Sequence, residues 1–87
     1  MQIIFFGEAG SVPERRKMTE LISLCETDLR TTPRLESGQS RNGVGAMEAY
    51  EIMRTPAIAV VRDDGSPLRI WQGELPSFAE LSYYYHS

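Results

Sequence analysis

The chain has 87 residues, of which 41% are hydrophobic and 24% charged, with a formal net charge of −3 and a single cysteine. This length favours one small domain, and the hydrophobic content is too high for a disordered protein. The acidic balance argues against a nucleic-acid-binding module, and one cysteine excludes an internal disulfide and dithiol chemistry within one chain.

The N-terminus carries no sign of a targeting segment. The first apolar run lacks a preceding basic region and is too short for a signal peptide. No stretch approaches the ~20 apolar residues of a membrane helix. We therefore expect a single domain over residues 1–87, located in the cytoplasm, with neither a membrane nor a nucleic acid as partner.

The first third of the chain predicts a buried strand followed by a helix. Gln2–Phe6 is a continuous apolar run, typical of a strand covered on both faces. From Pro13 to about Cys25 the apolar residues recur at helical spacing, so they share one helix face. That face consists of Met18, Leu21, Ile22 and Cys25. We therefore expect Cys25 to be a buried, small apolar residue rather than a reactive thiol.

The middle of the chain is more polar. Pro33 cannot donate a hydrogen bond to a sheet, so a strand around it belongs at a sheet edge. Residues 36–45 are rich in Gly, Ser and Asn, which indicates a surface loop. Residues 44–53 then predict a second helix, with Met53 on its apolar face.

The last third predicts two strands and a helix. Ala57–Val61 is apolar throughout and should lie in the centre of the sheet, whereas Leu68–Gln72 alternates and suits an edge. The turn between them, Asp63–Pro67, should make these strands an antiparallel hairpin. Ser77 and Glu80 have the spacing of a capping box at the start of the last helix.

The predicted element order is β-α-β-α-β-β-α. A strand, a helix and a second strand in succession favour parallel pairing of the first two strands. With the two apolar strands in the centre, the strand order becomes 2-1-3-4. We therefore predict an α/β fold with a four-stranded mixed sheet and helices on both of its faces.

This order and several motifs resemble the thioredoxin superfamily in its minimal, glutaredoxin-sized form. The segment "AYEIMRTPAIAVV" resembles the family's cis-proline strand, with Pro56 after Thr55 as the cis-proline. "GSPLRIWQGELPSFAEL" resembles the closing hairpin and last helix, with Gly73 as the glycine between them. Where the family carries Cys-x-x-Cys, this chain carries Ser11, Val12, Pro13 and Glu14. The resemblance therefore implies a thioredoxin-like fold without dithiol oxidoreductase activity, because a thiolate is the required nucleophile.

Ser11 has two interpretations. As a helix N-cap it would form a capping box with Glu14, and Pro13 would fit the first helical turn. Alternatively its hydroxyl could act as a nucleophile or bind a ligand. The only histidine, His86, is the penultimate residue, so no acid–base partner supports an activated serine. We favour the cap and expect no catalytic residue, no metal site and no cofactor.

The resemblance also implies a groove between the start of the first helix and the cis-proline loop. Its residues are Ser11, Val12, Pro13, Glu14, Arg16, Arg54, Thr55 and Pro56. The first candidate function is non-redox binding of a protein or peptide partner, as a complex subunit or a homodimer. The alternative is a glutathione-binding or glutathione-transferase-like enzyme with Ser11 near the thiol. Secondary partner-contact candidates are Trp71, Tyr83 and Tyr84, because a helix cannot bury three successive tyrosines.

Overall fold

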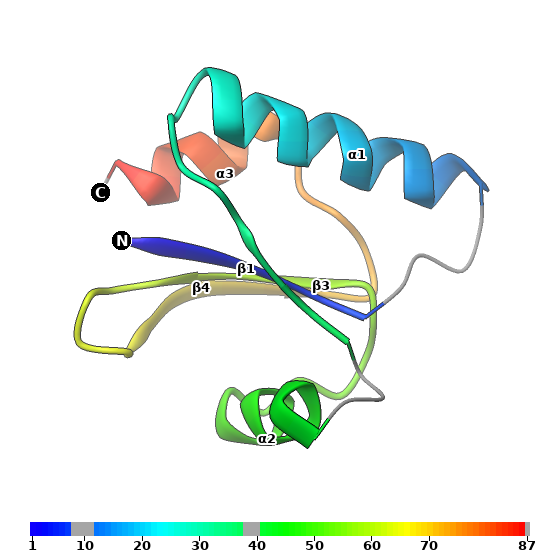
Figure 1. Cartoon of the computed structure of the whole chain (residues 1–87), viewed down its shortest axis with the longest axis vertical. Coiled ribbons are helices and arrows are strands. Elements are labelled where there is room, and N and C mark those ends of the chain that lie inside the picture. Colours follow the sequence, from blue (N-terminus) through cyan, green and yellow to red (C-terminus); the bar gives the residue numbers. More distant parts are fainter. Residues whose placement is uncertain (8–11, 38–40, 87) are drawn as a thin grey trace.

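The computed structural model describes residues 1–7, 12–37 and 41–86. The elements are β1 (Gln2–Phe6), α1 (Val12–Thr27), β2 (Arg34–Glu36), α2 (Arg41–Ala49), β3 (Ala57–Val61), β4 (Pro67–Gln72) and α3 (Phe78–Tyr85). This is the predicted order of elements, and Figure 1 shows how they are arranged around the sheet. The capping box predicted for Ser11 and Glu14 falls outside the described side chains.

The four strands form one mixed sheet of order β2-β1-β3-β4, as predicted. β1 pairs with β2 in parallel, and β3 pairs with both β1 and β4 in antiparallel fashion. All five residues of β3 are buried, whereas most residues of β2 and β4 are partly or fully exposed. The apolar strands thus occupy the centre and the polar strands occupy the edges, which confirms the reasoning from strand composition.

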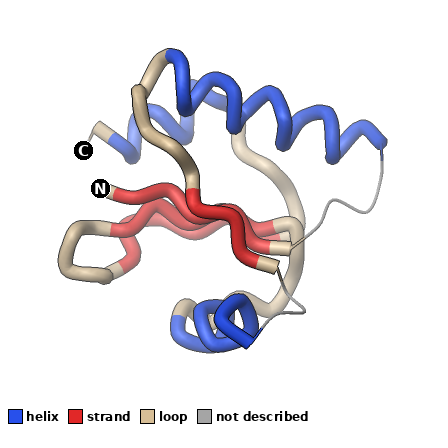
Figure 2. Tube along the Cα trace, in the orientation of Figure 1, coloured by secondary structure: helices blue, strands red, loops and turns tan. Residues whose placement is uncertain are grey.

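Alternate residues of the central strands enter two different apolar clusters, because successive side chains in a strand point to opposite faces. Ile3 and Phe5 pack in a cluster that includes Leu21 of α1 and Leu81 of α3. Ile4 and Phe6 pack in the other, with Ala46 and Met47 of α2 against it. Figure 1 draws α1 and α3 above the sheet and α2 below it, and Figure 2 shows the strands between them.

The second helix differs from its prediction at both ends. It begins at Arg41, inside the stretch predicted to be a loop, and Gly43 is buried within it. Gly and Asn are weak helix formers, so tertiary packing overrides the local preference there. It ends at Ala49, because Glu51 adopts a left-handed conformation and the Ile52 N–H donates to the Met47 carbonyl at 2.8 Å. This turn buries Ile52.

Met53 therefore does not belong to the apolar face of the second helix. Its exposed fraction is 88%, and it follows the left-handed turn that ends α2.

The last helix is closer to its prediction. Ser77 is the N-cap of α3, and its side-chain oxygen accepts a hydrogen bond from the Glu80 N–H at 3.2 Å. No helix in the described part of the chain is long and apolar enough to cross a bilayer.

Candidate functional site

The loop between α2 and β3 contains the Thr55–Pro56 bond, which is cis as predicted. Pro56 is buried, while Arg54 and Thr55 are exposed. The Pro56 carbonyl accepts a hydrogen bond from the Gly73 N–H at 3.0 Å, which ties the loop to the end of β4. The loop thus places two exposed polar side chains beside a buried proline at one end of the sheet.

Gly7, directly after β1, makes the closest approach to this loop. Its φ is +77°, a left-handed conformation that glycine adopts without steric cost. A Cβ atom added there would lie 2.6 Å from the Cβ of Thr55, well inside van der Waals contact. The Gly7 N–H also donates to the Glu36 carbonyl of β2 at 2.9 Å. Because Gly7 has no side chain, the Thr55 side chain can pack directly against the backbone at the end of β1.

The side chain of Gln72, the last residue of the edge strand β4, holds the same loop from another side. Its Oε1 accepts hydrogen bonds from the Met53 N–H at 2.7 Å and the Arg54 N–H at 3.3 Å. Its Nε2 donates to the Glu51 carbonyl at 3.4 Å. One side chain thus satisfies three backbone groups that the irregular loop leaves outside regular secondary structure.

We expect Gln72→Ala to loosen this loop. Each hydrogen bond contributes about 0.5–1.5 kcal/mol, and because the site is exposed, water replaces part of what is lost. The expected loss of unfolding free energy is about 1–2 kcal/mol, with faster hydrogen exchange at the amides of Met53 and Arg54. Gln72→Glu is the comparison variant: it keeps an accepting oxygen for the Met53 and Arg54 N–H groups, but replaces the donor to Glu51 by a charged acceptor. Unchanged amide protection in Gln72→Ala would show that the side chain does not anchor the loop.

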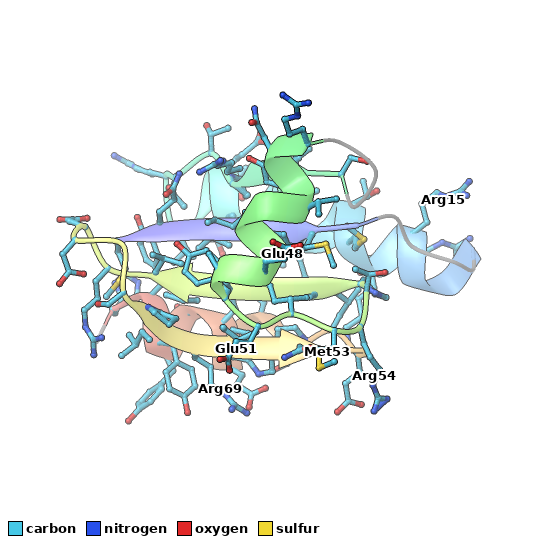
Figure 3. The ribbon with its side chains drawn as sticks, turned by 90° about the horizontal axis from the view of Figure 1, so that it is seen from below. Arg15, Glu48, Glu51, Met53, Arg54 and Arg69 are labelled. Carbon is cyan, nitrogen blue, oxygen red and sulfur yellow. The ribbon has the colours of Figure 1, made fainter. Side chains whose placement is uncertain are left out.

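The first turns of α1 lie at the same end of the sheet as this loop. Figure 3 shows Arg15 and Arg54 projecting from that end. Arg15 and Arg16 are exposed, and within the described residues no ion pair involves them or Arg54. Lys17 is already engaged, because its Nζ donates to the Leu75 carbonyl at 2.9 Å. Of the predicted groove residues, the structure thus brings Arg16, Arg54, Thr55 and Pro56 to one end of the molecule. Ser11 and the side chains of Val12, Pro13 and Glu14 lie outside the described part.

The secondary candidates, Trp71, Tyr83 and Tyr84, form an aromatic cluster between the edge strand β4 and α3. Trp71 and Tyr84 meet edge to face with ring centroids 5.6 Å apart, and the Arg69 guanidinium carbon lies 5.4 Å from the Trp71 ring centroid. Trp71 itself is buried, so its ring packs against the other members of the cluster from the protein interior. Tyr83 is the exposed member, with 69% of its surface accessible, and it packs edge to face on Tyr84.

Cys25 is fully buried in the cluster shared by α1, α3 and the sheet, which confirms its predicted position. Burial raises the pKa of its thiol to about 11, and the nearby Glu26 carboxylate acts in the same direction. This thiol is therefore a poor source of thiolate. Among the described residues, no group of three or more His, Cys, Asp and Glu side chains could hold a metal ion.

Two residues that shape the site were absent from the predicted set. Gly7 has a signal in the sequence, because a glycine directly after an apolar strand often marks a left-handed turn or a close approach. Gln72 has no such signal, since its role depends on a loop that is distant in sequence. No protein-family model matches this chain, and a search of curated proteins finds no matching relative.

Proposed function

We propose that the chain is a thioredoxin-like domain, with helices on both faces of its sheet, that binds a protein or peptide partner without redox chemistry. The element order and the strand order β2-β1-β3-β4 support the family resemblance. The proposed groove lies between the start of α1 and the Thr55–Pro56 loop. Burial of the chain's only cysteine supports a role other than thiol exchange.

The observation that carries this proposal is the contact between Gly7 and Thr55. It brings the end of β1 against the loop, where Arg54 and Thr55 are exposed. In the described part of the chain, neither the N–H nor the C=O of Thr55 has a hydrogen-bond partner. An extended peptide can use such unpaired main-chain groups without requiring one particular sequence.

The charges at this end of the molecule indicate the chemistry of the partner. Arg15, Arg16 and Arg54 are exposed cations without a carboxylate partner among the described residues. Guanidinium groups bind carboxylates through charge-assisted hydrogen bonds. The partner that fits best is therefore an extended peptide segment with acidic side chains, which would pair with the loop and meet these arginines.

A random peptide library displayed on phage tests this proposal. We expect the selected peptides to be rich in Asp and Glu, and their affinity can be measured by fluorescence anisotropy. Arg16→Glu and Arg54→Glu should each weaken binding about ten-fold or more, since a charge-assisted contact contributes ~1.5–3 kcal/mol. Arg69→Glu is the matched control, because it makes the same charge change on β4, beside the aromatic cluster.

Two outcomes would contradict the proposal. Binding that survives both groove variants and is lost in Tyr83→Ala and Tyr84→Ala would place the interaction on α3. Calorimetric binding of glutathione, abolished by Ser11→Ala, would instead favour the glutathione-binding alternative. Far-UV circular dichroism of each variant shows whether the fold is retained.

A further inference from the structure

The short strand β2 forms an open edge of the sheet. Within the described part of the chain it pairs only with β1, and Figure 2 shows it at the near edge. The Glu36 carbonyl accepts from the Gly7 N–H, so it points toward β1. Successive residues in a strand direct their N–H and C=O groups to opposite sides. Consequently, both main-chain polar groups of Leu35 point away from β1, toward the open edge.

Leu35 also exposes a large apolar side chain at this edge. Its exposed fraction is 62%, so most of this side chain is open to solvent in the single chain. It lies opposite Phe5 of β1 and therefore on the same face of the sheet. Beside it, a mainly apolar cavity of about 260 Å³ extends toward Met18 and Ile22 of α1. The edge thus offers a hydrogen-bonding main chain and an apolar contact together, which favours pairing with another strand.

The charges on β2 are complementary to those of a second, antiparallel β2. Arg34 and Glu36 flank Leu35 on the opposite face of the strand and form an ion pair with each other. When two such strands run antiparallel with Leu35 opposite Leu35, each Arg34 lies opposite the other copy's Glu36. Opposite charges directly across an antiparallel pair are stabilising, whereas like charges are destabilising.

We propose that two copies of this chain pair through β2, antiparallel and two-fold symmetric about Leu35. In this register the two Leu35 residues exchange a pair of N–H···O bonds, as the outward direction of their main-chain groups requires. Their side chains meet on the face that carries α1, and the Arg34 and Glu36 side chains form a four-membered charge network on the other face. The interface is self-complementary, as a two-fold dimer needs.

The opposite edge of the sheet is less suited to such pairing. β4 begins with Pro67, which lacks an N–H, and a register shift between Val60 and Val61 leaves Leu68 without a partner in the ladder. Short strands, edge charges, proline and bulges are devices by which proteins block edge pairing. β2 is short and carries two charges, and Pro33 directly precedes it, but within Arg34–Glu36 neither a proline nor a bulge interrupts the edge. The charges of β2 match those of its own copy, so a second copy fits this edge better than an arbitrary acidic or basic strand.

Sedimentation equilibrium tests the proposal on the full chain. The weight-average mass should rise with concentration from 9.8 kDa toward twice that value. Leu35→Lys should hold the mass at that of a single chain, because it places two ammonium groups opposite each other across the two-fold axis. Leu35 is exposed, so this substitution should leave the fold intact, which circular dichroism can verify. A wild-type mass that stays at 9.8 kDa at the highest accessible concentration would overturn the proposal.

A charge-swap pair tests the register itself. Arg34→Glu alone brings carboxylates opposite carboxylates, and Glu36→Arg alone brings guanidinium opposite guanidinium. Each variant alone should dimerise about ten-fold more weakly or worse, and an equimolar mixture should recover association, because every charge then faces its opposite. Arg62→Glu in the β3–β4 hairpin makes the same charge change outside both candidate interfaces; it is the control and should dimerise like the wild type. Two folded variants that fail to associate when mixed would refute the antiparallel register, and loss of the dimer in Arg62→Glu would move the interface to this hairpin.

Discussion

Gly7→Ala is expected to lower the free energy of unfolding by about 2–5 kcal/mol. A left-handed conformation costs about 1–2 kcal/mol for a residue with a Cβ, and forcing an extra methyl into a packed site costs about 1–3 kcal/mol more. Both penalties apply here, because φ is +77° and the new Cβ would lie 2.6 Å from Thr55. Since small domains are stable by about 5–15 kcal/mol, this substitution removes a large fraction of the total. Urea denaturation followed by circular dichroism measures the change.

Gly65 in the β3–β4 turn provides the matched control. Its φ is +91°, similar to that of Gly7, but a Cβ added there would meet no atom within 4 Å. Gly65→Ala should therefore cost only the conformational part, about 1–2 kcal/mol. The difference between the two variants isolates the contact with Thr55. Equal losses in both would show that this contact does not constrain the end of β1.

The contact between Gly7 and Thr55 illustrates which parts of the site could be predicted from the sequence. The cis bond before Pro56 is what the family resemblance of residues 49–61 implies, the central position of β3 follows from its apolar composition, and the structure confirms both. How the loop is held depends on Gly7 and Gln72, one preceding and one following it by many residues. The sequence of the loop itself indicates its conformation. The residues that hold the loop in place are distant in the sequence and come near it only in the folded chain.

The errors at α2 have a related cause. Gly, Ser and Asn in residues 36–45 favour a loop by local preference, yet α2 begins at Arg41 and buries Gly43. A buried glycine allows close approach of a helix to its neighbours, so packing outweighs its poor helix propensity. The left-handed Glu51 ends the helix without the glycine that usually signals such a turn. Local composition and apolar spacing therefore placed this helix several residues too late in the chain.

Cys25 should react with a thiol reagent about a thousand-fold more slowly, or slower still, in the native protein than in denaturant. Its side chain is 0% exposed, so the reagent reaches it only after the α1–sheet packing opens. The equilibrium fraction of open molecules in a domain of ordinary stability is about one in a thousand or less. Moving the thiol two residues away, in Cys25→Ala combined with Ser23→Cys, gives the control. Ser23 is exposed on the same helix, so this thiol should label readily without unfolding.

The raised pKa of Cys25 adds a pH dependence with a defined sign. Burial raises the pKa from 9.0 to about 11, so below pH 9 both folded and unfolded chains keep the proton. Between pH 9 and 11 the unfolded chain loses the proton first, and the folded state is therefore destabilised as pH rises through this window. Tyrosines and lysines titrate nearby, so the measurement is the wild-type unfolding free energy minus that of Cys25→Ala at each pH. That difference should be flat below pH 9 and fall between pH 9 and 11. A difference that stays flat through this window, or native labelling as fast as in denaturant, would show that Cys25 is not sealed in the core.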